Sequence, residues 1–219
     1  MSTIEDKPQA ADAGLPAANG GPEASSGLEA SSGLEAGLAA RIRTEREARG
    51  WSIAELAQHS GVSRAMISRI ERGEASPTAA LLGRLSGAFR LTVSTLLARA
   101  ESDAAGAGRV ARAEAQPVWR DPATGYVRRA VSPMGATPEL VRVELPPGAC
   151  VPYPASSYEH LAGQCIWVLS GELVFREGAA EHRLAAGDCL ALGPPATCAF
   201  LNPSQTEPCV YVVALARRP

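Results

Sequence analysis

The sequence contains no long apolar run, and its start has no apolar segment flanked by basic residues. No stretch of its 219 residues approaches the ~18 apolar residues that a membrane-spanning helix needs, and residues 1–10 do not have the pattern of a secretion signal. We therefore expect a cytoplasmic chain with no membrane partner. Its length is sufficient for two small domains.

Cysteine is absent from the first 149 residues, and no Cys-x-x-Cys pair occurs. The five cysteines are Cys150, Cys165, Cys189, Cys198 and Cys209, which is an odd number. This distribution argues against a disulfide framework and favours free thiols in a reducing compartment. We interpret each cysteine as a small buried hydrophobic residue, but leave a second role open for Cys198.

Net positive charge is concentrated in a single segment. The net charge of the chain is only -2, with -5 in residues 1–36 and -2 in residues 100–219. Residues 37–99 hold ten arginines against five glutamates, a net charge of +5. If the protein binds nucleic acid, this basic segment is expected to make the contact.

The N-terminal segment has little apolar surface. Residues 1–36 are mainly Ala, Gly, Ser, Pro and acidic residues, with a direct repeat of six residues at 23–28 and 29–34. Such a composition cannot offset the entropy lost on folding, so we expect a disordered tail. The alternative is a first helix that extends back to Leu28, which the glycines of this stretch oppose.

Residues 37–99 have the pattern of a compact all-α domain. Ser52, Ser63 and Thr92 are placed to cap helices, and Ser52 forms a capping box with Glu55. The five expected helices are Leu38–Arg49, Ile53–His59, Arg64–Arg72, Thr78–Phe89 and Val93–Ala98.

The C-terminal half has a different composition and a different pattern of apolar residues. Residues 100–117 are rich in Ala and Gly and are expected to form an interdomain linker. In residues 118–219, short apolar runs alternate with Gly, Pro and Asn turns, which predicts a small antiparallel β-barrel or sandwich. The expected strands are Val141–Leu145, Cys165–Leu169, Leu173–Phe175, Cys189–Leu192, Cys198–Leu201 and Val210–Leu215.

The spacing within residues 53–73 is typical of two short helices joined by a tight turn. Apolar residues fall where the two helices face each other, and Gly61 permits the positive φ that a three-residue turn requires. The second helix then presents Arg64, Ala65, Ser68 and Arg69 outward. Two arginines and two small residues suit the major groove of DNA, where arginine binds guanine O6 and N7.

This segment resembles the XRE, or phage-repressor-like, family of helix-turn-helix domains. The resemblance extends from Leu38 to Leu97 and is carried by the run Ile67–Gly73 and by Ser76–Thr78. It implies a double-stranded DNA operator as partner. The residues that it implies are Ser52 and Ser63 as phosphate contacts, Arg64, Ala65, Ser68 and Arg69 as base readers, Arg72 and Gly73 near the backbone, and Arg46 with Glu71 as an internal ion pair.

A helical module that binds another protein is the alternative for this domain. Such a module would expose an apolar patch on its second helix, whereas the exposed face here carries arginines. We therefore favour DNA.

The segment from Val118 to Ala216 resembles a cupin, a small β-barrel often fused behind XRE domains as a sensor. The resemblance rests on three turns, Leu169–Glu172, Ala186–Asp188 and Gly193–Pro195, the last followed by Asn202. Metal-binding cupins use three histidines and a glutamate. The corresponding residues here are Tyr158, His160, Cys198 and, at the glutamate position, Gln164, so one of four expected ligands remains.

We expect a metal-free pocket for a small-molecule effector, lined by Tyr158, His160, Gln164, Trp167 and Cys198, with no cofactor and no catalytic residue. A neutral donor set suits transition metals poorly, although Cys198 with His160 could still hold zinc or copper, or sense oxidants. A barrel that only dimerises and a cupin enzyme targeted by its helix-turn-helix domain are the alternatives. The sequence thus predicts a one-component, homodimeric transcriptional regulator.

Overall fold

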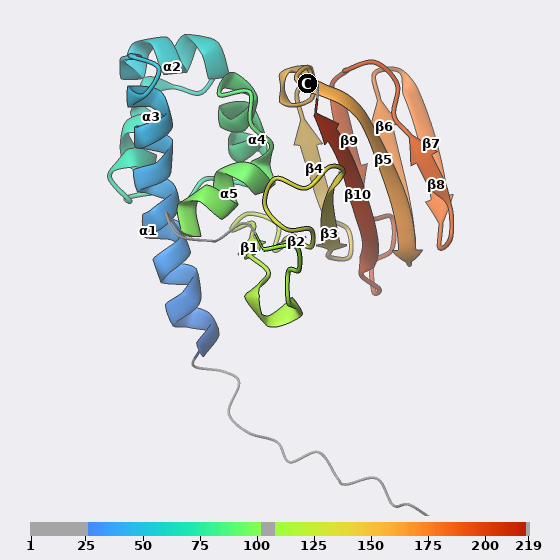
Figure 1. Ribbon diagram of the computed structural model, residues 1–219. Coiled ribbons are helices and arrows are strands. Elements are labelled where there is room, and N and C mark those ends of the chain that lie inside the picture. Colours follow the sequence, from blue (N-terminus) through green and yellow to red (C-terminus); the bar gives the residue numbers. More distant parts are fainter. Residues whose placement is uncertain (1–25, 102–107, 218–219) are drawn as a thin grey trace, which may run out of the picture.

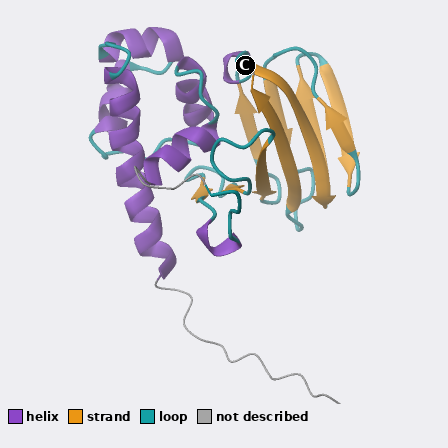
Figure 2. Cartoon of the chain, viewed as in Figure 1, coloured by secondary structure: helices purple, strands orange, loops and turns teal. Residues whose placement is uncertain are grey.

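The computed structural model describes residues 26–101 and 108–217, which form a helical domain followed by a β-domain (Figures 1 and 2). No described helix is both long and apolar enough to cross a membrane. The helices are α1 (Ser26–Glu47), α2 (Ile53–Ser60), α3 (Arg64–Glu71), α4 (Ala79–Ala88) and α5 (Val93–Glu101). Their number and order confirm the five-helix prediction.

Local chemistry explains where α2 and α3 begin. Ser52 and Glu55 form the expected capping box, in which the Ser52 side chain accepts from the Glu55 amide and the Glu55 carboxylate accepts from the Ser52 amide. Ser63 likewise accepts from the Met66 amide at the start of α3. Between them, Gly61 has φ 65° and ends α2, a conformation that a residue with a side chain adopts only with strain.

The first helix is longer than expected. It begins at Ser26 and not at Leu38, so the described part of the segment expected to be disordered, residues 26–36, is helical. Residues 1–25 lie outside the described part of the chain. Of the expected linker, Ala100 and Glu101 end α5, residues 102–107 are not described, and residues 108–117 form a loop with one 3₁₀ turn, η1 (Ala113–Ala115).

The β-domain consists of two antiparallel sheets. One has six strands in the order β1-β2-β3-β10-β5-β8, and the other has four in the order β4-β9-β6-β7. The strands are β1 (Val118–Arg120), β2 (Val127–Ala130), β3 (Glu139–Leu145), β4 (Cys150–Tyr153), β5 (Leu161–Ser170), β6 (Glu172–Glu177), β7 (Ala180–Ala185), β8 (Cys189–Ala191), β9 (Cys198–Leu201) and β10 (Cys209–Arg217). A 3₁₀ turn, η2 (Ala155–Ser157), follows β4. This is the cupin-like all-β domain that the sequence predicts.

Four strands, β1, β2, β4 and β7, were missed by the sequence prediction, and each has a reason. β7 is largely exposed and polar, so it has no apolar pattern. β1 and β2 carry arginines. β4 contains Pro152, which a strand tolerates at the edge of a sheet, and β4 lies at such an edge.

The two domains pack directly against each other, with α4 and α5 on the side that faces the β-domain (Figure 1). Two glycines of α4 allow the close approach. A Cβ atom at Gly83 would lie 2.5 Å from the Tyr153 ring, and one at Gly87 would lie 2.6 Å from the Ser156 carbonyl oxygen. The apolar core runs without a break from the helical domain into the β-domain.

Polar contacts also cross this domain junction. The Asp121 carboxylate accepts from the amide of Ala79, the first residue of α4, at 3.0 Å. Arg128 donates to the Ser94 hydroxyl at 2.9 Å, and the Thr92 hydroxyl donates to Glu139 at 2.8 Å. The helical domain therefore contacts the β-domain through both apolar and polar groups, which the expectation of two domains joined by a linker did not foresee.

Candidate nucleic-acid interface and ligand cavities

The α2–α3 unit presents the outer face of α3 to solvent. Ile67 and Ile70 are buried and fix the helix, whereas Arg64, Ala65 and Arg69 are exposed and Ser68 is half-buried. The structure thus places the four predicted base-reading residues together on one accessible face. Ser52 and Ser63, the predicted phosphate contacts, are exposed at the N-termini of α2 and α3.

Most arginines of the helical domain form ion pairs with glutamates of the same domain. Arg41, Arg49 and Arg99 surround the buried Glu45. Arg43, Arg46 and Arg72 pair with Glu47, Glu71 and Glu74. The four arginines that form no ion pair with any described residue are Arg64, Arg69, Arg84 and Arg90. Two of these four lie on α3, so much of the domain's unbalanced positive charge is at the face that would meet DNA.

The predicted internal pair between Arg46 and Glu71 is present. Arg46 donates twice to the Glu71 carboxylate, at 2.7 and 2.8 Å, and once to the Trp51 carbonyl oxygen at 2.8 Å. Both side chains are largely buried. A bidentate pair of this kind connects α1 with the end of α3.

Arg72 has partners that the sequence did not suggest. Its guanidinium donates to Glu74 at 2.6 and 2.7 Å and also contacts the Ser68 hydroxyl. In this arrangement Glu74 balances the charge of Arg72, and the Ser68 hydroxyl accepts a hydrogen bond from Arg72.

Arg84 is a candidate DNA contact that sequence reasoning missed. It lies on α4, outside the predicted recognition helix, and donates to the Gly61 carbonyl oxygen at 3.2 Å. That contact brings its charge to the α2–α3 turn. Only the folded structure reveals this position, because the two residues are 23 positions apart.

Aromatic side chains fill the interior of the β-domain. Phe200 packs against Tyr153, Phe175 and Tyr211, with ring centroids 4.9–5.9 Å apart. The remaining space, which also touches the start of α5, amounts to about 40 Å³. The expected ligand pocket inside the barrel is therefore too small for an organic effector.

A larger pocket of about 440 Å³ opens beside the barrel interior, and Tyr158, Gln164 and Cys198 line it. Burial raises the pKa of the Cys198 thiol to about 11, although its hydrogen bond with Tyr158 acts in the opposite direction. Cys198 is consequently a thiol at neutral pH and not a thiolate, which opposes the redox-sensing alternative.

Two residues expected in the pocket lie elsewhere. Trp167 is 50% exposed and on the opposite face of β5 from Gln164, because side chains alternate along a strand. His160 lines neither cavity of the β-domain. Burial and the nearby Arg217 and Arg90 lower the pKa of His160.

The metal site that the cupin resemblance implies does not fit these residues. No group of three His, Cys, Asp or Glu side chains in residues 26–101 and 108–217 is arranged to hold a metal ion. His160 is separated from the pocket that Cys198 lines, and the thiol is protonated. A transition metal needs several converging donors, so these residues do not form a metal centre.

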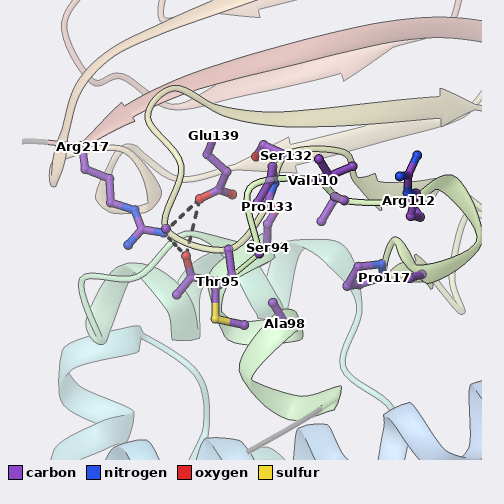
Figure 3. Close-up of a pocket in the computed structure, with 16 residues that line it drawn as sticks. Ser94, Thr95, Ala98, Val110, Arg112, Pro117, Ser132, Pro133, Glu139 and Arg217 are labelled. Atoms are coloured by element: carbon purple, nitrogen blue, oxygen red, sulfur yellow. Dashed lines mark hydrogen bonds and ion pairs between the residues drawn. The ribbon is translucent and has the colours of Figure 1, made fainter. Parts of the chain in front are cut away.

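A cleft of about 430 Å³ separates α5 from the loops of the β-domain (Figure 3). Its walls are mainly apolar and include Ala98, Val110 and Pro133. At one end Arg217 donates to Glu139 at 3.0 Å and also contacts Thr95 of α5, as the dashed lines in Figure 3 show. The cleft therefore has an apolar body and a charged end that joins both domains.

Comparison with known proteins identifies the helical domain. Residues 42–96 match the helix-turn-helix family HTH_3. The HTH-type transcriptional regulator SutR of Escherichia coli (strain K12) is 38% identical over 65 residues, 30% of this chain and 36% of SutR. The uncharacterized HTH-type transcriptional regulator Rv0474 of Mycobacterium tuberculosis (strain ATCC 25618 / H37Rv) is 39% identical over 59 residues, 27% of this chain and 42% of that protein. The match thus spans less than half the length of these curated relatives.

A solved structure extends the likeness to both domains. The crystal structure of an HTH_3 family transcriptional regulator from Vibrio cholerae superposes with a TM-score of 0.70 at 21% sequence identity, covering 86% of this chain and 99% of that chain. At this identity the likeness concerns the fold. Residues 42–96 are therefore similar to the helix-turn-helix family HTH_3, and the chain joins this domain to an all-β domain of two antiparallel sheets.

Proposed function

We propose that the protein is a transcriptional regulator that binds a specific double-stranded DNA operator in the cytoplasm. The observation that carries the proposal is the exposed face of α3, where Arg64 and Arg69 have no ion-pair partner among the described residues while most other arginines of the domain are paired. Unpaired guanidinium groups on a rigid helix suit the major groove.

In this proposal α3 enters the major groove and the flanking elements hold the DNA backbone. Arg64, Ala65, Ser68 and Arg69 would contact base edges. Phosphate contacts would come from the helix N-termini at Ser52 and Ser63, where amide groups and the helix dipole favour an anion. Arg72, Gly73 and Arg84 would add backbone contacts at the two ends of the unit.

The test is a mobility-shift titration on an operator obtained by selection from random DNA. Arg69→Ala should weaken binding by about 5- to 150-fold, the equivalent of ~1–3 kcal/mol for one base-reading arginine, and relax specificity at one base pair. Arg183→Ala is the control, because Arg183 is an exposed arginine on β7. Equal effects of both substitutions, or binding that is insensitive to salt, would contradict the proposal and favour a protein-binding module.

We also propose a homodimer that forms through the outer face of the six-stranded sheet. Trp167 is half exposed there, and its cross-strand neighbours are Val212 and Cys189. Monomeric proteins seldom expose such an apolar face. Arg142 and Glu144 on β3 border it with both signs of charge, so the same face of a second copy is complementary. Two copies would also read two half-sites of an operator.

Small-molecule sensing is the third part of the proposal, with the effector in the cleft between α5 and the β-domain. A ligand there would act on the Arg217–Glu139–Thr95 contacts that join the domains. The pocket lined by Tyr158, Gln164 and Cys198 is the second candidate, because it has a similar volume.

A metabolite library screened by thermal shift distinguishes the two pockets. A hit whose shift is lost in Ala98→Trp, which fills the cleft, but retained in Cys198→Ser supports the cleft. The opposite result supports the pocket beside Tyr158, and a hit unaffected by either substitution contradicts both.

The alternative, a cupin enzyme, predicts about one bound transition-metal ion per chain, whereas a regulator without catalytic activity predicts less. Elemental analysis of protein purified without added metal or chelator should show less than stoichiometric transition metal. One equivalent per chain that is lost on His160→Ala would overturn the non-enzymatic proposal.

A further inference from the structure

The space of about 40 Å³ that remains in the interior of the β-domain extends to the domain junction, between the start of α5 and strands β2 and β4. Thr92, which precedes α5, and Val93, the first residue of α5, line this cavity together with residues of the β-domain. Its volume exceeds the ~10–15 Å³ that one water needs and is far below the ~300 Å³ of an organic ligand site. Its occupant must therefore be water or a small ion.

Four side chains that line this cavity each carry a buried polar atom that forms no hydrogen bond of good geometry with a described residue, although Tyr126 is close enough to the Tyr153 hydroxyl to add to the effect of burial in raising its pKa. The atoms are Arg128 Nε, Tyr153 Oη, Ser157 Oγ and Gln164 Oε1. The four residues are between 5% and 9% exposed. Buried polar groups in folded proteins are nearly always paired, so four such atoms on residues that line one cavity favour a missing partner inside it.

The charge of Arg128 indicates that the missing partner is an ion and not water. The Arg128 guanidinium is always charged, and both of its hydrogen bonds go to neutral groups, the Tyr126 hydroxyl at 3.2 Å and the Ser94 hydroxyl at 2.9 Å. Glu139, the acid that acts on Arg128, already accepts from Thr92 and Arg217. No described carboxylate lies within ion-pair distance of Arg128, so Glu139 compensates its charge only from a greater distance, and a buried charge without a close counter-charge is disfavoured.

We propose that the cavity binds a small monovalent anion of the chloride type. Arg128 Nε, the Tyr153 hydroxyl and the Ser157 hydroxyl supply three donors, and the Gln164 amide can present its NH₂ group in place of its oxygen, since the two ends of an amide have the same shape. Water could satisfy these hydrogen bonds but would not balance the charge. Because Arg128 also holds Ser94 of α5, the anion stabilises the contact between the domains.

Thermal unfolding of the full chain in sodium chloride, sodium bromide and sodium gluconate at equal ionic strength tests the proposal. Gluconate is too large for the cavity. We expect a Tm about 2–4 °C higher in either halide than in gluconate, the shift that ligand binding of modest strength gives a protein of this size. Arg129→Met, at the next position of β2, should retain this difference, and Arg128→Met should lose it.

A halide effect of equal size in wild type and Arg128→Met, or no effect in wild type, would overturn the proposal. If Arg128→Met does not fold, Ser157→Ala removes one donor at a smaller structural cost and should reduce the halide effect. Crystals grown in bromide give an independent readout. An anomalous scattering peak in the cavity is expected, whereas density without anomalous signal would identify water and overturn the proposal.

Discussion

At the residue scale, Glu45 is the buried carboxylate to which three arginines of the helical domain bind. It is 4% exposed and binds Arg41, Arg49 and Arg99, which brings together α1 and α5. Burial opposes its ionisation, but hydrogen bonds from the three arginines outweigh this and lower the pKa of Glu45 to about 2. The carboxylate therefore stabilises the fold at neutral pH.

Glu45 should account for part of the acid sensitivity of the protein. Because its pKa is lower in the folded state than in the unfolded state, its contribution is present above pH ~4.5 and is lost as the pH falls towards 2. Glu45→Gln should lower the unfolding free energy at pH 7 by about 3 kcal/mol. Its stability should also depend less on pH between 4.5 and 2, which chemical denaturation measures. An unchanged pH dependence would show that Glu45 is not the responsible group.

Glu74 restrains Arg72, which we propose as a contact to the DNA backbone. It is exposed and pairs with Arg72, whose charge it balances. Glu74→Gln should raise operator affinity by a factor of about 3–10 at low salt, with a smaller gain at high salt where surface charges are screened. Glu207→Gln, an exposed acid of the β-domain, is the control for net charge. Equal gains from both would attribute the effect to overall charge and not to Arg72.

At the element scale, alternation along β5 separates the two faces of the six-stranded sheet. Ile166 and Val168 point into the core, whereas Trp167 and Leu169 are exposed on the outer face. One strand thus supplies both the barrel interior and the face that we assign to the dimer.

Trp167→Arg should convert the dimer into a monomer. A charge placed at the centre of an apolar interface cannot be paired by the identical surface opposite, and the exposed position leaves the fold intact. Light scattering coupled to size exclusion measures the mass. Val110→Arg is the matched control, because Val110 is also an exposed apolar side chain but lies at the cleft. A dimer that persists in Trp167→Arg would place the interface elsewhere.

At the scale of the whole molecule, the two domains share one core and should unfold together. The close approach of α4 depends on Gly87, where a Cβ atom would meet the Ser156 backbone at 2.6 Å. Backbone cannot move aside as a flexible side chain can. The junction therefore places the helix-turn-helix unit close against the β-domain.

Gly87→Val should separate the domains and split a single calorimetric unfolding transition into two. We expect this separation although valine has a higher intrinsic helix propensity than glycine, by a few tenths of a kcal/mol. Gly163→Ala, where an added Cβ meets nothing within 4 Å, should retain one transition. A single unchanged transition in Gly87→Val would show that the junction tolerates the extra side chain.

The sequence by itself determined the helical domain and the chemistry of its α3 face. Cap residues, the Gly61 turn and the spacing of apolar residues act over a few positions, so α2 and α3 begin and end close to where the pattern places them. The same local reasoning located most strands with an apolar pattern. It failed for α1, whose helix continues through glycines, and for polar strands such as β7.

Only the tertiary structure decided what lies inside the β-domain. Tyr158, Gln164 and Cys198 share a pocket, whereas His160 and Trp167 do not, because spacing along the chain does not specify which face of a strand or loop meets the interior. The docked α4 and α5, the cleft between the domains and the buried Arg128 likewise arise from contacts between distant segments. Packing of this kind depends on the whole arrangement, which local patterns of charge and hydrophobicity do not encode.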